Sequence, residues 1–170
     1  MRNLKINKTF LIMEATELMQ IIQNYAESHQ PKSKNVFLLD EVKKVLELHK
    51  KRYAQINADE KPLLAVNKNT MGAVGGYGWS GLLITDKKLY YKCTKDTFWA
   101  GLVMLSNKGE IPLKQIHSIA IGRHDACFGT AYVGHQLLIN GKNMGLLRMG
   151  GSVEFDEKAI NELSIIFNKL

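Results

Sequence analysis

Short runs of alternating apolar and polar residues, separated by tight turns, fill the larger, C-terminal part of the chain. Residues 81–92 contain two apolar runs around the polar turn 86–88, and residues 111–121 are expected to hold a further strand. Asn140-Gly141 separates two more apolar runs, and both residues tolerate the positive φ angles of a two-residue hairpin loop. A period of two indicates strands with one buried face. The pattern therefore predicts a series of antiparallel hairpins.

The first part of the chain has a different hydrophobic pattern. Within residues 10–26, apolar residues recur at steps of three and four, which is typical of an amphipathic helix. A second segment of this kind covers about residues 38–56. The polar stretch 57–62 then separates helical spacing from strand spacing. We therefore expect an N-terminal helical extension over residues 1–58 and a second domain over residues 59–170.

The C-terminal segment is predicted to form one helix from about Asp156 to the end of the chain. Asp156 is a suitable N-cap, because its carboxylate can accept a hydrogen bond from a backbone N–H of the first turn. Ile160, Leu163 and Phe167 share one apolar stripe on this helix. We expect this stripe to cover one open end of a barrel and to hold it together.

The charge of the chain limits the partners that we expect. The sequence has 23 Lys and Arg residues against 16 Asp and Glu residues, which gives a formal net charge of +7. A mild excess of lysine is typical of a soluble surface and permits anionic partners. Arginine, whose planar fork phosphate and nucleic-acid sites favour, is scarce, and a recognition-helix motif is absent from the sequence. We therefore do not expect nucleic-acid binding.

Cysteine usage and the N-terminal sequence bear on the cellular compartment. Cys93 and Cys127 are the two cysteines, too few for the dense disulfide framework of small secreted domains. The apolar run 10–13 ends at Glu14 and is too short for a signal-peptide core or a membrane span. We expect a cytoplasmic protein.

From about residue 59 onward the chain resembles the bacterial pleckstrin-homology-like and GRAM-type domains. The matching pieces are the opening strand 61–66, the hairpin 81–91 with its Thr-Asp-basic turn, the Ile-Pro-Leu strand within 109–116, and the C-terminal helix. The resemblance implies an α+β fold: an N-terminal helical hairpin, then an antiparallel β-barrel of about seven strands closed by a C-terminal helix. It also implies a role in binding or self-assembly rather than in catalysis.

A glycine-rich segment, residues 67–80, follows the first predicted strand and is expected to be a loop. It contains most of a G-x-G-x-x-G pattern, but a strand follows it rather than the helix that a dinucleotide fold requires. No arginine lies between Arg52 and Arg123, whereas lipid-binding members of the family carry arginine in their first strands. An alternative role for the loop's tryptophan is burial in the core. We expect the following residues to contact a partner or ligand: Lys68, Gly76, Tyr77, Gly78 and Trp79.

Sequence signals for catalysis or metal binding are weak. The chain has no nucleophile-elbow motif, and His124-x-x-Cys127 lacks the paired second half of a structural zinc site. We therefore expect no enzymatic activity, no cofactor and no metal. The predicted function is protein binding or self-association through the barrel. The alternative is peripheral binding of anionic lipid headgroups through the 67–80 loop and neighbouring lysines.

Overall fold

A computed structural model describes residues 15–28, 35–71, 77–95, 105–124, 134–147 and 153–168; only the backbone is described for 67–71, 77–79, 123–124, 134 and 153–158. The helices are α1 (Ala15–Ser28), α2 (Lys43–Arg52) and α4 (Val153–Phe167), with the short 3-10 helices η1 (Leu39–Val42) and η2 (Leu113–Gln115). The strands are β1 (Val36–Leu38), β2 (Pro62–Met71), β3 (Tyr77–Thr85), β4 (Lys88–Thr94), β5 (Ser106–Pro112), β6 (Ile119–His124), β7 (Gly134–Ile139) and β8 (Lys142–Leu147).

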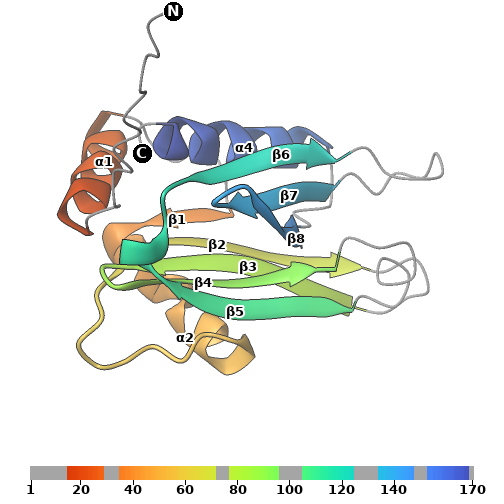
Figure 1. The fold of residues 1–170 in the computed structure, drawn as a ribbon, viewed down its shortest axis with the longest axis horizontal. Coiled ribbons are helices and arrows are strands. Elements are labelled where there is room, and N and C mark those ends of the chain that lie inside the picture. Colours follow the sequence, from red (N-terminus) through yellow and green to blue (C-terminus); the bar gives the residue numbers. More distant parts are fainter. Residues whose placement is uncertain are drawn as a thin grey trace, which may run out of the picture.

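The strands form one antiparallel sheet that curls into a half-barrel. Their order is β1-β2-β3-β4-β8-β7-β6, and β5 pairs with β4 outside this path. Strand β4 pairs with β5 along its whole length but meets β8 at a single residue pair, Thr94 with Leu146. The sheet therefore bends at this junction into two layers, β2 to β5 in one and β6 to β8 in the other (Figure 1). The predicted α+β class is confirmed.

A glycine makes the junction between β4 and β8 sterically feasible. Gly145 has a φ angle of +116°, a backbone conformation that residues with a Cβ rarely adopt. A Cβ placed at Gly145 would lie 2.5 Å from the carbonyl oxygen of Thr94. The close approach of the two strands at the bend therefore depends on the absence of a side chain at this position.

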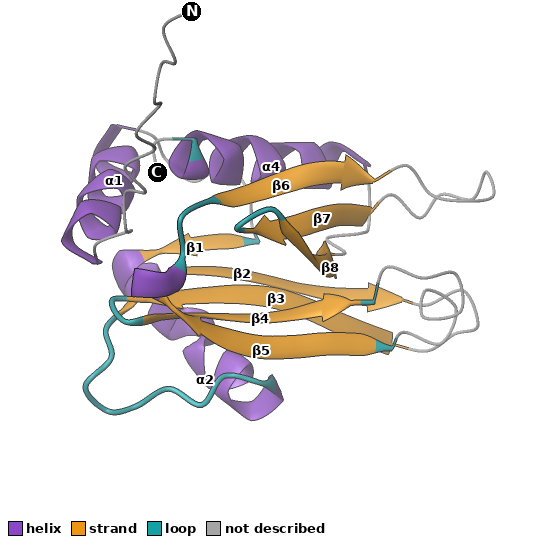
Figure 2. Ribbon diagram, in the orientation of Figure 1, coloured by secondary structure: helices purple, strands orange, loops and turns teal. Residues whose placement is uncertain are grey.

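The strands β2, β3 and β4 are buried on both faces. Leu64, Ile84 and Leu89 are paired across the three strands and belong to the larger apolar core, together with α1 and α4. The next residues along, Ala65, Leu83 and Tyr90, face the opposite side and belong to a smaller core with α2. Figure 2 shows α2 beneath this layer and α1 with α4 at the other side of the sheet. One sheet thus serves as the wall of two apolar cores.

Helix α4 covers the end of the larger core. Leu163 and Phe167 are buried, and Ile160 is partly buried against the same cluster. The helix begins at Val153, so Asp156 lies inside its first turn rather than at the N-cap, and that prediction is wrong. Helix formation extends further because acidic residues are favourable throughout the first turn, near the positive end of the helix dipole.

The second predicted helix is shorter than expected and is preceded by a strand. Residues 36–38 form β1 and pair with Leu64 to Val66 of β2, and the α-helix covers only Lys43–Arg52. Leu39, directly after β1, has a φ angle of +50° that ends the strand sharply. The apolar spacing of this segment favours a helix, but pairing with β2 outweighs local preference. The N-terminal part of the chain therefore contributes an edge strand to the sheet.

The β7–β8 hairpin has the predicted Asn140-Gly141 turn. The two residues have φ angles of +52° and +75°, and Ile139 pairs with Lys142 across the two-residue loop. The Asn140 side chain also fixes the preceding connection: its Oδ1 accepts a hydrogen bond from His117 N at 2.7 Å. The turn therefore positions both its own hairpin and the start of β6.

Candidate functional site

Strands β2 and β3 extend further into the glycine-rich segment than predicted. Strand β2 continues to Met71 and β3 begins at Tyr77, and the backbone of Asn67 to Met71 pairs with that of Tyr77 to Gly81. The prediction of a loop over residues 67–80 is therefore wrong in its bounds. The physical reason is that backbone N–H and C=O groups pair regardless of side chain, so the ladder continues through glycine-containing sequence.

The predicted contact residues are placed by their backbone alone. Lys68 pairs with Ser80, and Trp79 pairs with Asn69, so both lie in the β2–β3 ladder. Gly76 and the side chains of the other predicted contact residues lie outside the described part of the chain. The choice between a partner-contacting and a core-facing Trp79 stays a prediction, as does lipid binding through this segment.

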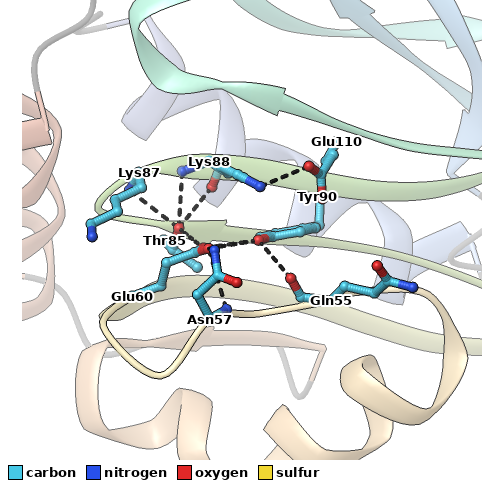
Figure 3. A network of polar contacts seen from close by, with 8 residues as sticks. All are labelled: Gln55, Asn57, Glu60, Thr85, Lys87, Lys88, Tyr90 and Glu110. Carbon is cyan, nitrogen blue, oxygen red and sulfur yellow. Dashed lines mark hydrogen bonds and ion pairs between the residues drawn. The ribbon is translucent and has the colours of Figure 1, made fainter.

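A buried polar cluster surrounds the carboxylate of Glu60 (Figure 3). Glu60 follows a tight turn in which its own N–H donates to the carbonyl of Asn57 at 3.1 Å. The backbone N–H and the side-chain Nδ2 of Asn57 donate in return to Glu60 Oε1, at 3.3 and 2.9 Å. Only 7% of Glu60 is exposed. The turn therefore supplies two of the hydrogen bonds that a buried carboxylate requires.

Thr85, at the end of β3, connects this carboxylate to the β3–β4 turn. Its Oγ1 donates to Glu60 Oε2 at 2.8 Å. The same oxygen accepts hydrogen bonds from the backbone N–H groups of Lys87 and Lys88, at 3.2 and 2.9 Å. The hydroxyl thus acts as donor and acceptor at once. It holds the turn against the segment that precedes β2.

Tyr90 on β4 completes the cluster. Its hydroxyl lies 2.9 Å from each carboxylate oxygen of Glu60 and 3.1 Å from the carbonyl oxygen of Gln55. Burial raises the pKa of the Tyr90 hydroxyl, and the hydrogen bond to Glu60 raises this pKa further. The phenol therefore stays protonated and serves as a hydrogen-bond donor.

Two ion pairs, and two hydrogen bonds between Lys61 and Asp86, surround the cluster at the surface. Lys87 pairs with Asp59, and Lys88 Nζ lies 2.7 Å from Glu110 Oε1. Asp86 Oδ1 accepts a hydrogen bond from the N–H of Lys61 at 2.8 Å, and the N–H of Asp86 donates to the carbonyl of Lys61 at 2.9 Å. Exposed ion pairs contribute little to stability, so the buried contacts dominate.

The hydrogen bonds of this cluster have a structural role. Donors from Asn57, Thr85 and Tyr90 occupy both oxygens of Glu60. A general base must direct a lone pair towards the proton that it removes, and this carboxylate directs its lone pairs at its own fold. We interpret the cluster as a clasp that fixes residues 55–60 to β3 and β4. Sequence reasoning missed it, because no local pattern links Glu60 to Tyr90.

The clasp supports β4, and β4 supports an open edge of the sheet at β5. Within the described residues, β5 pairs only with β4. The N–H of Lys95 donates to the carbonyl of Leu105, and the N–H of Leu113 donates to the carbonyl of Lys87. Hydrogen-bonded pairs alternate along an antiparallel ladder, so the odd-numbered residues of β5 bond to β4. The backbone N–H and C=O groups of Ser106, Lys108 and Glu110 therefore point away from β4.

Basic side chains meet on the outer face of β4 and β5. Lys92 and Lys108 are directly opposite each other in the β4–β5 pairing. Burial lowers the pKa of Lys92, and the positive charges of Arg52 and Lys108 lower it further. Among the described residues, neither Lys92 nor Lys108 has an ion-pair partner. Lys108 therefore brings to the free edge a positive charge that no acidic residue in the described part of the chain neutralises.

Two further properties of the described residues bear on function. Nowhere in these ranges do three His, Cys, Asp or Glu side chains gather closely enough to hold a metal ion. The helices of the described part are also too short or too polar to cross a membrane. Comparison of the chain with protein-family models, curated proteins and solved structures gives no match.

Proposed function

We propose that this chain is a non-catalytic interaction module, built on a pleckstrin-homology-like barrel, that binds an extended polypeptide segment along the free edge of β5. The curled antiparallel sheet and the helix α4 over its core support the barrel assignment. The observation that carries the function is the row of outward-pointing backbone groups on β5.

An extended peptide can satisfy such a row by adding one more strand to the sheet. Main-chain hydrogen bonds then supply affinity, and side chains on alternate positions supply specificity. On β5 the side chains of Ser106, Lys108 and Glu110 are exposed. The same three residues therefore offer main-chain hydrogen bonds for affinity and side chains for specificity. The two apolar cores cover both faces of β2 to β4, so contact with another chain is left to the edges of this layer, β1 and the longer β5 (Figure 2).

Proline at position 108 tests the proposal, because it removes one outward N–H group. The odd-numbered residues bond to β4, so Lys108→Pro leaves the internal ladder intact, and proline is tolerated on edge strands. Lys108→Gln is the matched control, since it removes the charge and keeps the N–H. Peptides selected for binding from a displayed random library are the probe.

We expect the selected peptides to slow amide hydrogen exchange at Lys108 and Glu110 and to lose much more affinity for Lys108→Pro than for Lys108→Gln. Circular dichroism checks that both variants fold. Peptides that bind the proline variant as tightly as the unmodified protein would overturn the proposal.

A further inference from the structure

We infer that the segment bound at the edge of β5 is β5 of a second copy of this chain, paired antiparallel about a two-fold axis at Gly109. The inference rests on the proposed function, since it names the partner for the same edge. An isologous contact of this kind needs a surface that is complementary to itself. The charge order along β5 has that property.

The outward-pointing residues determine which register is complementary. In an antiparallel pair centred on Gly109, Lys108 of one copy lies opposite Glu110 of the other, and the reverse pair forms by symmetry. These are the residues whose N–H and C=O groups point outward, so each pair also exchanges two backbone hydrogen bonds. A register centred on Lys108 would instead place two lysines opposite each other. Opposite charges in direct cross-strand pairs stabilise a sheet, and like charges destabilise it.

The environment of Lys108 within one copy favours the same arrangement. Its cross-strand neighbour is Lys92, a like charge, and no described carboxylate pairs with either residue. Glu110 from a second copy would bring a negative charge to this position. Glu110 contacts Lys88 through one oxygen, Oε1, and is partly exposed, so its carboxylate remains accessible from outside. Assembly therefore relieves a repulsion that the single chain leaves in place.

The axis position is favourable for backbone approach. Gly109 has no side chain, and the Tyr91 ring on the neighbouring strand already occupies the space where its Cβ would lie, 2.9 Å from Tyr91 Oη. Pro112 lacks an N–H and ends the strand, which limits the pairing to a short segment. Charges and proline on an edge strand discourage indiscriminate pairing, so only a strand with matching charges is accepted.

A charge swap tests the inference directly. In a dimer of Lys108→Glu, the new glutamate of each copy faces Glu110 of the other copy, so both cross-strand pairs are acidic. In a dimer of Glu110→Lys, both pairs consist of two lysines. An equimolar mixture of the two variants restores both opposite-charge pairs, as does the double variant Lys108→Glu/Glu110→Lys. Lys114→Glu, at an exposed position outside β5, is the control for net charge. Sedimentation velocity at increasing protein concentration gives the dimer dissociation constant of each sample.

We expect the unmodified protein and the Lys114→Glu control to dimerise and each single variant to dimerise more weakly by about tenfold or more. The mixture and the double variant should recover dimerisation. Single variants that associate as tightly as the unmodified protein, or a mixture that does not recover, would overturn the inference. A monomeric chain whose Lys108 and Glu110 amides are protected by selected peptides would overturn the second-copy assignment alone and leave the proposed function standing.

Discussion

The hydroxyl of Tyr90 lies 2.9 Å from both carboxylate oxygens of Glu60, across 30 residues of sequence. Both residues are buried, so neither can exchange this contact for water. Glu60 belongs to the segment that leaves α2, and Tyr90 lies in the first half of β4. The contact therefore joins the wall of the sheet to the chain that crosses its outer face.

Tyr90→Phe should lower the free energy of unfolding by about 1–3 kcal/mol, because it removes a donor from a buried carboxylate. Urea denaturation monitored by circular dichroism measures the change. A double-mutant cycle with Glu60→Gln should show that the two substitutions are not additive. Asp59→Asn is the control. It removes a carboxylate from the same turn, but this carboxylate is exposed and, among the described residues, pairs only with Lys87. Equal effects of Tyr90→Phe and Asp59→Asn would contradict the clasp.

His49 should make the protein less stable as the solution becomes acidic. Its ring is fully buried, Nδ1 lies 2.8 Å from the Tyr53 hydroxyl, and burial lowers the pKa of His49 from 6.5 to about 4. The unfolded chain therefore takes up a proton at a higher pH than the folded chain. The contribution of neutral His49 to stability is complete above pH 6.5 and is lost as the pH falls towards 4.

Denaturation midpoints at a series of pH values measure this dependence. His49→Gln should flatten the pH profile between about pH 6.5 and 4, whatever its effect on stability at neutral pH. His117→Gln, at an exposed position, is the matched control for the loss of an imidazole. An unchanged slope in His49→Gln would show that other groups cause the acid sensitivity.

Gly145→Ala should destabilise the fold more strongly than Gly141→Ala. Both glycines have positive φ angles, so alanine is strained at either position, by about 1–2 kcal/mol. At Gly145 the new Cβ would also meet the Thr94 carbonyl at 2.5 Å, whereas at Gly141 nothing lies within 4 Å. Thermal unfolding of the two variants separates strain from the collision. Similar losses would mean that β8 can move away from β4 at little cost.

Leu163→Ala should cost about 2–5 kcal/mol, because it leaves a cavity in the larger core beneath α4. Ile165→Ala is the matched control: the same helix loses a side chain of the same size, but Ile165 is 40% exposed. Urea titration of both variants gives the comparison. If Ile165→Ala proves as costly as Leu163→Ala, α4 packs through a different face.

Local sequence patterns were sufficient for the hairpins and the helix stripes. The Asn140-Gly141 turn was predicted because few residue pairs adopt two successive positive φ angles, and the structure confirms it. The stripe of Leu163 and Phe167 follows from helical spacing alone. The turn and the stripe depend on residues only a few positions apart, so they can be predicted from the local sequence.

Features that depend on distant pairing were missed. Leu38 fits the helical apolar spacing of the residues after it, and pairing with Leu64 to Val66 of β2, far along the chain, makes residues 36–38 a strand instead. The strand expected within residues 111–121 is divided in the structure: Pro112 ends β5, and η2 intervenes before β6 begins at Ile119. The clasp around Glu60 and the junction at Thr94 likewise exist only once the sheet has folded. No periodicity in the sequence encodes such contacts.

The double-sided burial of β2 to β4 has a consequence for how these strands choose their alignment. In most sheets a slip by one residue would bring polar side chains into the core, and this cost fixes the pairing. Here Leu63 to Val66 are buried without alternation, so a slipped strand would still present apolar groups to both sides. The selection must come from contacts that tolerate no shift, namely Lys61 with Asp86 and Glu60 with Thr85. These contacts therefore disfavour a misaligned sheet as well as stabilising the aligned one.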